Sequence, residues 1–323
     1  MKATNNIAVI GLGGVGGYFG GKIAYNIEKN NNKDYQTYFI ARDDHLKSIK
    51  EKGLILMDSN GNTLICRPQL AIDNFNELPE QPAIIMLAVK SYDLESTLDQ
   101  IHSKVTKNTI ILPLLNGIDI YERIRIKIKS GIILPSCVYI SSHIEKPGVI
   151  LHGAGEGLII FGPDPQHDKI YPSVLLDAFK LFGIKYKWTE EINIAIWEKY
   201  IFIASYAMVT TYSDKSINEV FSDYNLKELT RQIMLEIYNI GLAKNIAFDK
   251  YTVENAINKA RVLPYNTKSS YQLDIAEKGA KNESNIYAET IIKMSKETGL
   301  QVPVTKRIYN KILKQIDSRC KVC

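Results

Sequence analysis

The sequence has few cysteines and no long uninterrupted apolar run. Its four cysteines among 323 residues are Cys66, Cys137, Cys320 and Cys323. They form no evenly spaced framework, which argues against a disulfide scaffold. No apolar run approaches the roughly 20 residues that span a bilayer. The N-terminus lacks the charged region, apolar core and cleavage site of a signal peptide. We therefore expect a cytoplasmic protein with no membrane partner.

The chain also has little excess of charge of one sign. The 40 basic and 35 acidic residues give a net charge of +5, spread along the chain without a block of like charge. A nucleic-acid-binding surface would need a denser basic face with interleaved aromatic residues, so we expect no nucleic-acid partner. The mild positive surplus is compatible with a phosphate-bearing ligand.

The first half of the chain alternates short apolar runs with helical patterns. This alternation predicts parallel strands joined by helices, in a doubly wound sheet of the Rossmann type. The expected strands are residues 7–10, 38–41, 83–89 and 109–115, with a helix at 15–27 and a hairpin of 55–57 with 63–66. Further short strands at 138–140 and 158–161 are expected to extend the same sheet.

After residue 188 the apolar residues follow helical spacing. The expected helices are residues 192–212, 226–243, 252–260, 270–277, 286–298 and 304–316, with Gly299 and Pro303 separating the last two. The fold class is therefore α/β with a second, all-α part. We expect a dinucleotide-binding domain over residues 1–189 and a helical substrate or catalytic domain over 190–323.

A glycine loop follows the first expected strand and opens the first helix. It matches G-x-G-x-x-G in the run Gly11, Leu12, Gly13, Gly14, Val15 and Gly16. The first glycine of this pattern allows a tight turn, the second lets the backbone approach a pyrophosphate, and the third allows close packing of helix on strand. The helix N-terminus then offers free N–H groups to the phosphates. The alternative is a glycine-rich turn without a ligand.

Arg42 bears on which dinucleotide the loop would bind. NAD enzymes place Asp or Glu at the end of the second strand, where it holds the ribose 2′-hydroxyl. Here that strand ends in Arg42, whose guanidinium can bind a 2′-phosphate. This favours NADP over NAD, although Asp43 follows directly. A solvated loop charge is the alternative interpretation of Arg42.

Several segments together resemble the ketopantoate reductase (2-dehydropantoate 2-reductase) family. They run nearly end to end: GLGGVGGYFGG, ARDDHLKSIKEKGL, AVKSYDL, LLNGID, YISSHIEKPGVILHGAGEGLIIFG, WEK, SSYQLD, Glu283 and GLQVPVT. The resemblance implies a dinucleotide-binding domain followed by a helical domain. It also implies NADPH-dependent reduction of a 2-keto acid, foremost 2-dehydropantoate to pantoate in pantothenate biosynthesis.

Lys199 is the candidate catalytic residue. It lies in the mostly apolar run 197–204, where burying a lysine is costly unless its charge is used or paired. A buried lysine can act as a general acid, whereas a lysine at a helix edge can simply extend into solvent. The residues alone leave both interpretations open. The resemblance implies that Lys199 is the family's catalytic lysine, which protonates the keto oxygen.

The resemblance assigns four further residues. Lys90 and Asn116 each follow an expected strand, at the end where open α/β sheets bind ligands. By resemblance Lys90 lies beside the cofactor, and Asn116 holds the nicotinamide or the substrate. Ser270 and Glu283 match the family's substrate-binding hydroxyl and carboxylate. An exposed lysine, a turn asparagine and solvated polar residues are the corresponding alternatives.

Two positions depart from the family pattern. The family often carries Asn four and eight residues after the catalytic lysine, but here these positions are Ile203 and Ala207. A buried substrate hydroxyl would lose partners there, unless Ser205, Tyr206 or Asn218 compensates. A less polar 2-keto acid is therefore an alternative substrate, and a non-catalytic NADP sensor is a third hypothesis.

Two smaller expectations complete the sequence-based interpretation. A single C-x-x-C formed by Cys320 and Cys323 is insufficient for zinc, and we expect no metal. Many proteins of this size form two-fold dimers, so a homodimer is possible although no feature of the sequence indicates its interface.

Overall fold

A computed structural model describes residues 5–167, 170–276 and 281–320 of the chain. It forms two compact units: Met1–Leu115 with Ile120–Ile192, and Asn116–Asp119 with Asn193–Cys323. The short segment Asn116–Asp119 thus belongs to the helical unit, although it lies far from the rest of that unit in sequence. Glu277, expected to end a helix, and Cys323 lie outside the described residues, as does the side chain of Cys320.

The first unit contains a six-stranded parallel sheet, which confirms the expected doubly wound fold. Its strand order is β5-β2-β1-β6-β7-β8, so the winding reverses between β1 and β6. In chain order the strands are β1 (Asn5–Ile10), β2 (Tyr35–Ile40), β5 (Leu70–Ile72), β6 (Ile84–Leu87), β7 (Ile110–Pro113) and β8 (Ile132–Ile133). Ligands of such sheets bind at the carboxyl ends of strands beside the reversal.

A second sheet corrects the expectation that residues 138–140 and 158–161 extend the first. They belong to two long antiparallel strands that pair with the hairpin strands and a late strand. The members are β3 (Leu54–Asp58), β4 (Thr63–Cys66), β9 (Ser136–Lys146), β10 (Val149–Phe161) and β11 (Lys185–Trp188). Only one end of β9 is buried, and its remaining residues are largely exposed. The apolar run therefore revealed only part of its length.

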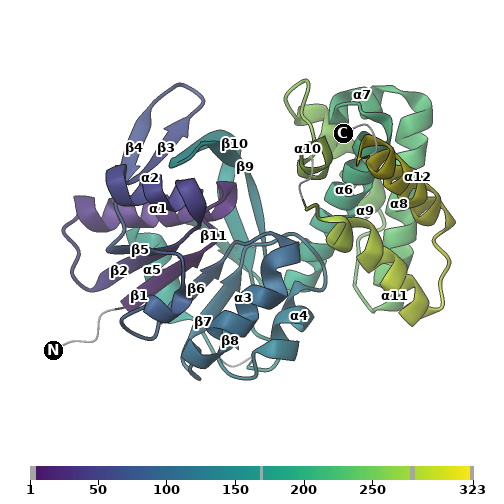
Figure 1. Cartoon of the computed structure of the whole chain (residues 1–323). Helices are drawn as coiled ribbons and strands as arrows, with labels where there is room; N and C mark the ends of the chain where they lie inside the picture. The colour runs from purple at the N-terminus through teal and green to yellow at the C-terminus, as the bar shows by residue number, and fades with distance from the viewer. Residues whose placement is uncertain (1–4, 168–169, 277–280, 321–323) are drawn as a thin grey trace. The chain divides into compact units, whose positions relative to one another are not determined.

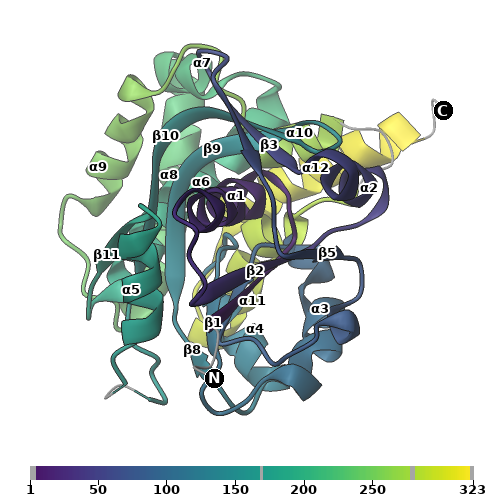
Figure 2. The ribbon, with the colours of Figure 1, turned by 90° about the vertical axis from the view of Figure 1, so that its left-hand side faces the viewer.

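Helix α1 (Gly14–Lys29) lies between the two sheets, where Figure 2 shows it end-on. A side chain added at Gly20 would lie 3.0 Å from Val9 of β1, and one added at Gly21 would lie 2.9 Å from Leu56 of β3. Such close approach on both sides requires residues without side chains. The buried residues of α1 accordingly join both sheets in one hydrophobic core.

The remaining helices of the first unit are shorter. They are α2 (Asp43–Lys52), α3 (Leu94–Ile101), α4 (Ile120–Lys127) and α5 (Ser173–Leu181), with 3₁₀ turns η1 (Phe75–Glu77), η2 (Ser91–Asp93) and η3 (His102–Lys104). Helices α3 and α4 lie side by side beside β6, β7 and β8 (Figure 1), while α5 packs against β11.

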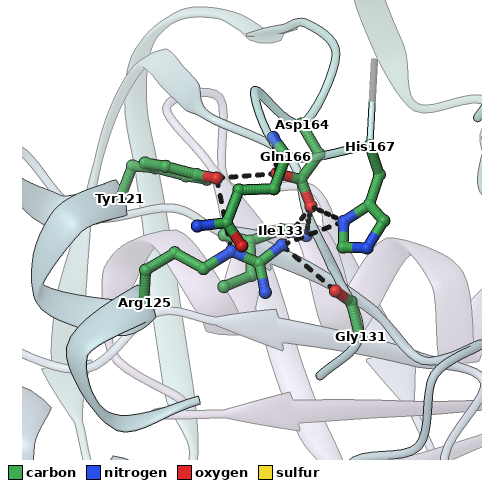
Figure 3. A network of polar contacts seen from close by, with 7 residues as sticks. All are labelled: Tyr121, Arg125, Gly131, Ile133, Asp164, Gln166 and His167. Atoms are coloured by element: carbon green, nitrogen blue, oxygen red, sulfur yellow. Dashed lines mark hydrogen bonds and ion pairs between the residues drawn. The ribbon is translucent and has the colours of Figure 1, made fainter. Parts of the chain in front are cut away.

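A buried polar cluster holds the segment that follows β10 (Figure 3). The carboxylate of Asp164, fully buried, pairs with Arg125 of α4 and accepts a 2.7 Å hydrogen bond from the Tyr121 hydroxyl. His167 Nδ1 lies 3.0 Å from the same carboxylate, and the backbone N–H of Ile133 donates to it at 2.9 Å. Burial alone would raise the pKa of Asp164, but these hydrogen bonds outweigh it and lower the pKa.

The second unit is all-α, as expected (Figure 1). Its elements are α6 (Ile192–Ser213), α7 (Ile217–Ser222), α8 (Tyr224–Ala243), α9 (Thr252–Asn258), η4 (Lys259–Val262), α10 (Ser270–Ala276), η5 (Asn285–Glu289), α11 (Thr290–Thr298) and α12 (Pro303–Cys320). The expected helix 286–298 is divided, because η5 is a π-helical segment. Gly299 ends α11 in the left-handed region and Pro303 begins α12, as their positions predicted.

Helix α6 is more apolar than we expected from a sequence without a long uninterrupted apolar run. By length and composition alone it could cross a membrane, with a mean hydropathy of 1.2 over its most apolar window. However, 61% of that window is buried inside the structure. Because its apolar residues surround the whole helix, α6 has the pattern of a buried core helix.

Candidate active site

The glycine loop connects β1 to α1 at the point where the winding of the sheet reverses. Gly13 is the N-cap of α1 and supplies no side-chain hydrogen bond, so the first N–H groups of the helix have no capping side chain. A Cβ at Gly13 would meet no atom within 4 Å, whereas one at Gly16 would lie 2.0 Å from the carbonyl oxygen of Gly11. Gly16 is therefore needed for packing, and Gly13 leaves open space beside the N-terminus of the helix. This arrangement fits a pyrophosphate.

His45, which the sequence-based prediction omitted, connects the glycine loop to the backbone of Gly148. Its Nε2 lies 2.8 Å from the carbonyl oxygen of Leu12, and its Nδ1 accepts a 3.0 Å hydrogen bond from the backbone N–H of Gly148. Since Nδ1 accepts, Nε2 carries the proton and donates to Leu12. Burial lowers the pKa of His45, which favours this neutral form. A single histidine in a short helix offers no sequence pattern that would reveal this role.

Arg42 lines an open hollow of about 450 Å³ at the carboxyl ends of β2 and β5. The other lining residues are Asp43, Asp73, Asn74, Asn76 and Gln100. The Arg42 side chain is 56% exposed, and its Nη1 lies 3.4 Å from Asp93 Oδ2 of η2. An exposed pair at this distance is weak, so the guanidinium is available to an anionic ligand. Asp43 adopts a positive φ of 52° directly after Arg42, and it lines the same hollow.

Lys90 belongs to the same unit as the glycine loop. It lies three residues after the end of β6 and is the N-cap of η2. The adjoining backbone of Ala88 and Val89 would lie within 2.8 Å of a Cβ at Gly11. Lys90 therefore follows directly on the backbone that packs against the glycine loop.

Lys199 and Asn116 are brought together inside the helical unit. Lys199 lies on α6 and is only 8% exposed, and its Nζ donates a 2.7 Å hydrogen bond to Asn116 Oδ1. Asn116 reaches this position because Asn116–Asp119 is part of the helical unit. Asp119, at the end of that segment, is buried, and its carboxylate lies 3.4 Å from the Thr290 hydroxyl.

Ser270 and Glu283 come from the C-terminal half of the same unit. Ser270 is the exposed first residue of α10, and its Oγ lies 3.2 Å from the hydroxyl of Tyr287. That hydroxyl also accepts a 3.5 Å contact from Asn116 Nδ2. Glu283 is 6% exposed and lies two residues before η5. The unit thus joins Lys199, Asn116 and Ser270 in one series of contacts, through a tyrosine that the sequence-based prediction omitted.

The residues named as substitutes for the two absent asparagines lie in the interior of the helical unit. Ala207 is 2% exposed and Ser205 is fully buried. The Tyr206 hydroxyl donates to the carbonyl of Ile257, and Asn218 Nδ2 donates to the carbonyls of Ala260 and Leu263. Tyr206 and Asn218 thus each make hydrogen bonds within the unit, whereas Ser205 Oγ and Asn218 Oδ1 are buried without a hydrogen-bond partner among the described residues.

A metal centre finds no support in the part of the chain that the structure describes. There, no group of three or more His, Cys, Asp or Glu side chains could hold a metal ion. Cys66 and Cys137 are both buried free cysteines.

Comparisons with known proteins match nearly the whole chain. Residues 7–166 match the family described as Ketopantoate reductase PanE/ApbA, and residues 191–316 match its C-terminal part. The chain is 24% identical over 301 residues to the Uncharacterized oxidoreductase YkpB of Bacillus subtilis, covering 93% of this chain and 95% of that protein. It is 23% identical over 303 residues to 2-dehydropantoate 2-reductase of Streptococcus pyogenes, with coverage of 94% and 95%.

Solved structures give the same result for the fold. The 2-dehydropantoate 2-reductase of Porphyromonas gingivalis superposes with a TM-score of 0.80 at 26% identity, covering 96% of this chain and 99% of that chain. A D-mandelate dehydrogenase crystallised with NADH and anilino(oxo)acetate gives a TM-score of 0.83 at 20% identity, with coverage of 97% and 99%. The dimeric ketopantoate reductase of Staphylococcus aureus gives 0.74 at 18% identity, with coverage of 97% and 99%.

Proposed function

Because this chain belongs to the ketopantoate reductase family, we propose that it reduces 2-dehydropantoate to pantoate with NADPH. The family consists of oxidoreductases that reduce 2-keto acids with a nicotinamide dinucleotide, and this chain is such an enzyme. The specific acid, the choice of NADPH and the roles of individual residues are the content of the proposal. The sensor hypothesis has no support once the family is known.

Lys199 is the proposed general acid. The observation that carries the proposal is that Lys199 is buried and hydrogen-bonded to Asn116. NADPH, when bound, supplies the hydride that reduces the carbonyl carbon. The Lys199 ammonium donates a proton to the carbonyl oxygen, so the C=O bond becomes a C–O–H group and the lysine is left neutral. Its positive charge also stabilises negative charge developing on that oxygen. Asn116 Oδ1 holds the ammonium at 2.7 Å, which restricts its orientation.

Substrate binding is proposed for Asn116, Ser270 and Glu283. The hydroxyl of Ser270 can donate to the substrate carboxylate, and the Glu283 carboxylate can accept from a substrate hydroxyl. Their support is that Ser270 is exposed, while Glu283 lies two residues before η5, the segment that carries Tyr287.

The cofactor is proposed to bind through the glycine loop, Arg42 and Lys90. The N-terminus of α1 and the open space at Gly13 suit the pyrophosphate. Arg42 can hold a 2′-phosphate, which only NADPH carries. Dissociation constants for NADPH and NADH, measured on wild type and Arg42→Ala, test this assignment. We expect the substitution to weaken NADPH binding about tenfold or more and to leave NADH binding almost unchanged. Equal losses for both dinucleotides would contradict the role of Arg42.

The substrate is tested by the rate of NADPH consumption with a panel of 2-keto acids. The panel contains ketopantoate, 2-ketoisovalerate and phenylglyoxylate. Turnover of ketopantoate well above the other two is the expected result. Turnover confined to another acid would retain the reductase and replace the proposed substrate.

A less polar 2-keto acid is the second candidate, favoured by Ile203 and Ala207. The same fold carries D-mandelate dehydrogenase, so the fold does not determine the acid. Ile203→Asn is the sharper test because Ile203 is partly exposed, whereas Ala207 is buried. An increase in ketopantoate turnover would mean that a polar group alone was missing. No increase, together with turnover of an apolar acid, would favour the second candidate.

A cytoplasmic location and a homodimer complete the proposal. The support for a dimer is general, since two-fold assemblies predominate among oligomers, and one protein of the same fold is described as dimeric. Sedimentation of the purified protein tests the assembly.

A further inference from the structure

The hydroxyl of Tyr287 lies between two of the proposed site residues. It contacts Asn116 Nδ2 at 3.5 Å and Ser270 Oγ at 3.2 Å. Asn116 in turn accepts the 2.7 Å hydrogen bond from Lys199. All four residues belong to the helical unit, but they come from four separate segments. The tyrosine therefore connects the proposed acid with the proposed carboxylate-binding hydroxyl.

The chemistry of the groups gives these contacts a direction. A lysine ammonium can only donate, so Asn116 must turn its carbonyl oxygen to Lys199 and its NH₂ group to Tyr287. The tyrosine oxygen then accepts from Asn116 and keeps its own proton. When that proton is donated to Ser270 Oγ, the serine retains its proton for a substrate carboxylate. Tyr287 thus favours the donor orientation that the proposed role of Ser270 requires.

The backbone around Tyr287 is held in an unusual conformation. Tyr287 lies in the π-helical segment η5, and such segments occur frequently at functional sites. The Thr290 hydroxyl donates at 2.8 Å to the carbonyl of Asn285, five residues earlier. The buried hydroxyl of Tyr200 donates to the carbonyl of Ile286 and lies 3.3 Å from the carbonyl oxygen of Tyr287. Because Tyr200 follows Lys199 on α6, the same helix turn carries the lysine and fixes the tyrosine segment.

The ring of Tyr287 is also fixed by packing. It is only 2% exposed and lies against the ring of Tyr271, with centroids 5.2 Å apart. The Tyr271 hydroxyl is bound to Ser284 Oγ at 2.6 Å. With its backbone and ring both held, the Tyr287 hydroxyl can orient its neighbours at little entropic cost.

We propose that Tyr287 is a positioning residue that orients Ser270 and Asn116 for the 2-keto acid. This inference rests on the proposed function and extends it to a residue outside the predicted site. It also identifies a polar group of the site, the Tyr287 hydroxyl on η5. Helix α6 offers no such group at Ile203 and Ala207, the two positions where the family often carries Asn. The shorter contact is to Ser270, and Lys199 keeps its acceptor without the tyrosine. Substrate binding should therefore suffer more than the chemical step.

Tyr287→Phe tests the proposal, with Tyr206→Phe as a matched control. Tyr206 is also a buried tyrosine of this unit, and its hydroxyl makes one 3.2 Å hydrogen bond to a backbone carbonyl. For Tyr287→Phe we expect KM for the 2-keto acid to rise about five- to tenfold, kcat to change less than about twofold, and NADPH affinity to stay constant. The control should leave KM unchanged. Equal KM values in wild type and Tyr287→Phe would overturn the proposal.

A double-mutant cycle with Ser270→Ala shows whether Tyr287 acts through the serine. If it does, Tyr287→Phe should have little further effect on KM in the Ser270→Ala background. Tyr206→Phe should have the same small effect in both backgrounds. Additive losses would mean that the tyrosine is merely structural, and they would overturn the positioning role.

A binding measurement separates this inference from the proposed reaction. Oxamate, an unreactive mimic of a 2-keto acid, is titrated calorimetrically into the protein saturated with NADP. Weaker oxamate binding by Tyr287→Phe than by Tyr206→Phe would support the positioning role even if the wild type turned over none of the tested acids. If the wild type neither binds oxamate nor turns over any acid, the proposed function fails and this inference fails with it.

Discussion

The two units build their candidate sites from different parts of the chain. In the first unit the proposed dinucleotide site consists mainly of backbone: a turn after β1, the N-terminus of α1 and the space left by Gly13. In the helical unit the site consists of side chains, and Lys199, Asn116, Tyr287 and Ser270 come from four segments. A backbone site depends on local sequence, whereas a side-chain site depends on how distant segments pack.

The largest expected effect separates the two sites at Lys199. Lys199→Ala removes the proposed general acid, and we expect kcat to fall about a thousandfold. The proposed dinucleotide site lies in the other unit, so the NADPH dissociation constant should change less than about twofold. Steady-state rates and NADPH fluorescence titration measure the two quantities. Full activity in this variant would refute the proposed role of Lys199.

Two glycines of the loop allow a matching test of the proposed dinucleotide site. A Cβ at Gly16 would lie 2.0 Å from the backbone oxygen of Gly11, whereas one at Gly13 meets open space. Gly16→Ala should therefore destabilise the protein by several kcal/mol, in the range of severe packing defects. Gly13→Ala should fold normally and bind NADPH at least about tenfold more weakly, because the methyl group occupies the proposed pyrophosphate position.

Thermal unfolding and NADPH titration of both glycine variants check this contrast. Tight NADPH binding by Gly13→Ala would mean that the pyrophosphate lies elsewhere. A fully stable Gly16→Ala variant would show that the loop has room to move.

The same contrast explains what the sequence could predict. Parallel strands buried on both faces appear as continuous apolar runs, so β1, β2, β6 and β7 were predicted within a few residues. The glycine loop was predicted because its chemistry follows from six consecutive residues. By contrast, the second half of β9 is largely exposed and the middle of β10 is only partly buried, so their apolar runs suggested short strands in the wrong sheet.

The roles of Tyr287 and His45 could not be predicted for a different reason. Each acts through contacts with residues far away in sequence: Asn116 is 171 residues from Tyr287, and Gly148 is 103 residues from His45. The resemblance to a family supplied Lys199, Asn116, Ser270 and Glu283, which composition and spacing alone left ambiguous.

The Asp164 cluster tests whether side-chain networks in the first unit serve stability instead of the cofactor. Asp164→Asn leaves the buried Arg125 without its ionic partner, and we expect a loss of about 3 kcal/mol in the free energy of unfolding. Asp99→Asn is the control, because it removes an exposed pair with Lys127 of the same helix α4. That change should cost less than about 1 kcal/mol. Urea unfolding measures both, and equal losses would contradict the importance of burial.

The lowered pKa of Asp164 also predicts how this stability depends on pH. The ionised form is favoured more strongly in the folded than in the unfolded protein. Its contribution is therefore fully present above the ordinary value of 3.8 and is lost as the pH falls through the lowered folded pKa. Between neutral pH and this acidic range, the stability of Asp164→Asn should decline less than that of wild type, which acid titrations of both proteins will show.

The smallest expected effect would blur the comparison, because His45 is a side chain that supports a backbone site. Burial lowers its folded pKa below the ordinary value of 6.5, so the neutral ring is favoured in the folded protein. The two hydrogen bonds that the His45 ring makes to Leu12 and Gly148 are therefore both present above pH 6.5. The bond from Gly148 is lost as the pH falls through the lowered folded pKa. A protonated Nδ1 cannot accept from Gly148, so acid should loosen the glycine loop.

Replacement by glutamine isolates this titration. His45→Gln retains a side-chain donor and acceptor, but the glutamine amide does not become protonated at acidic pH. We expect NADP binding by wild type to weaken more than binding by His45→Gln as the pH is lowered from neutral through the lowered folded pKa of His45. The 2′-phosphate of NADP titrates near this range in both experiments, so the difference between the proteins reports His45 alone. Identical pH profiles would show that the glycine loop holds its shape through its backbone, and the contrast between the two units would then be complete.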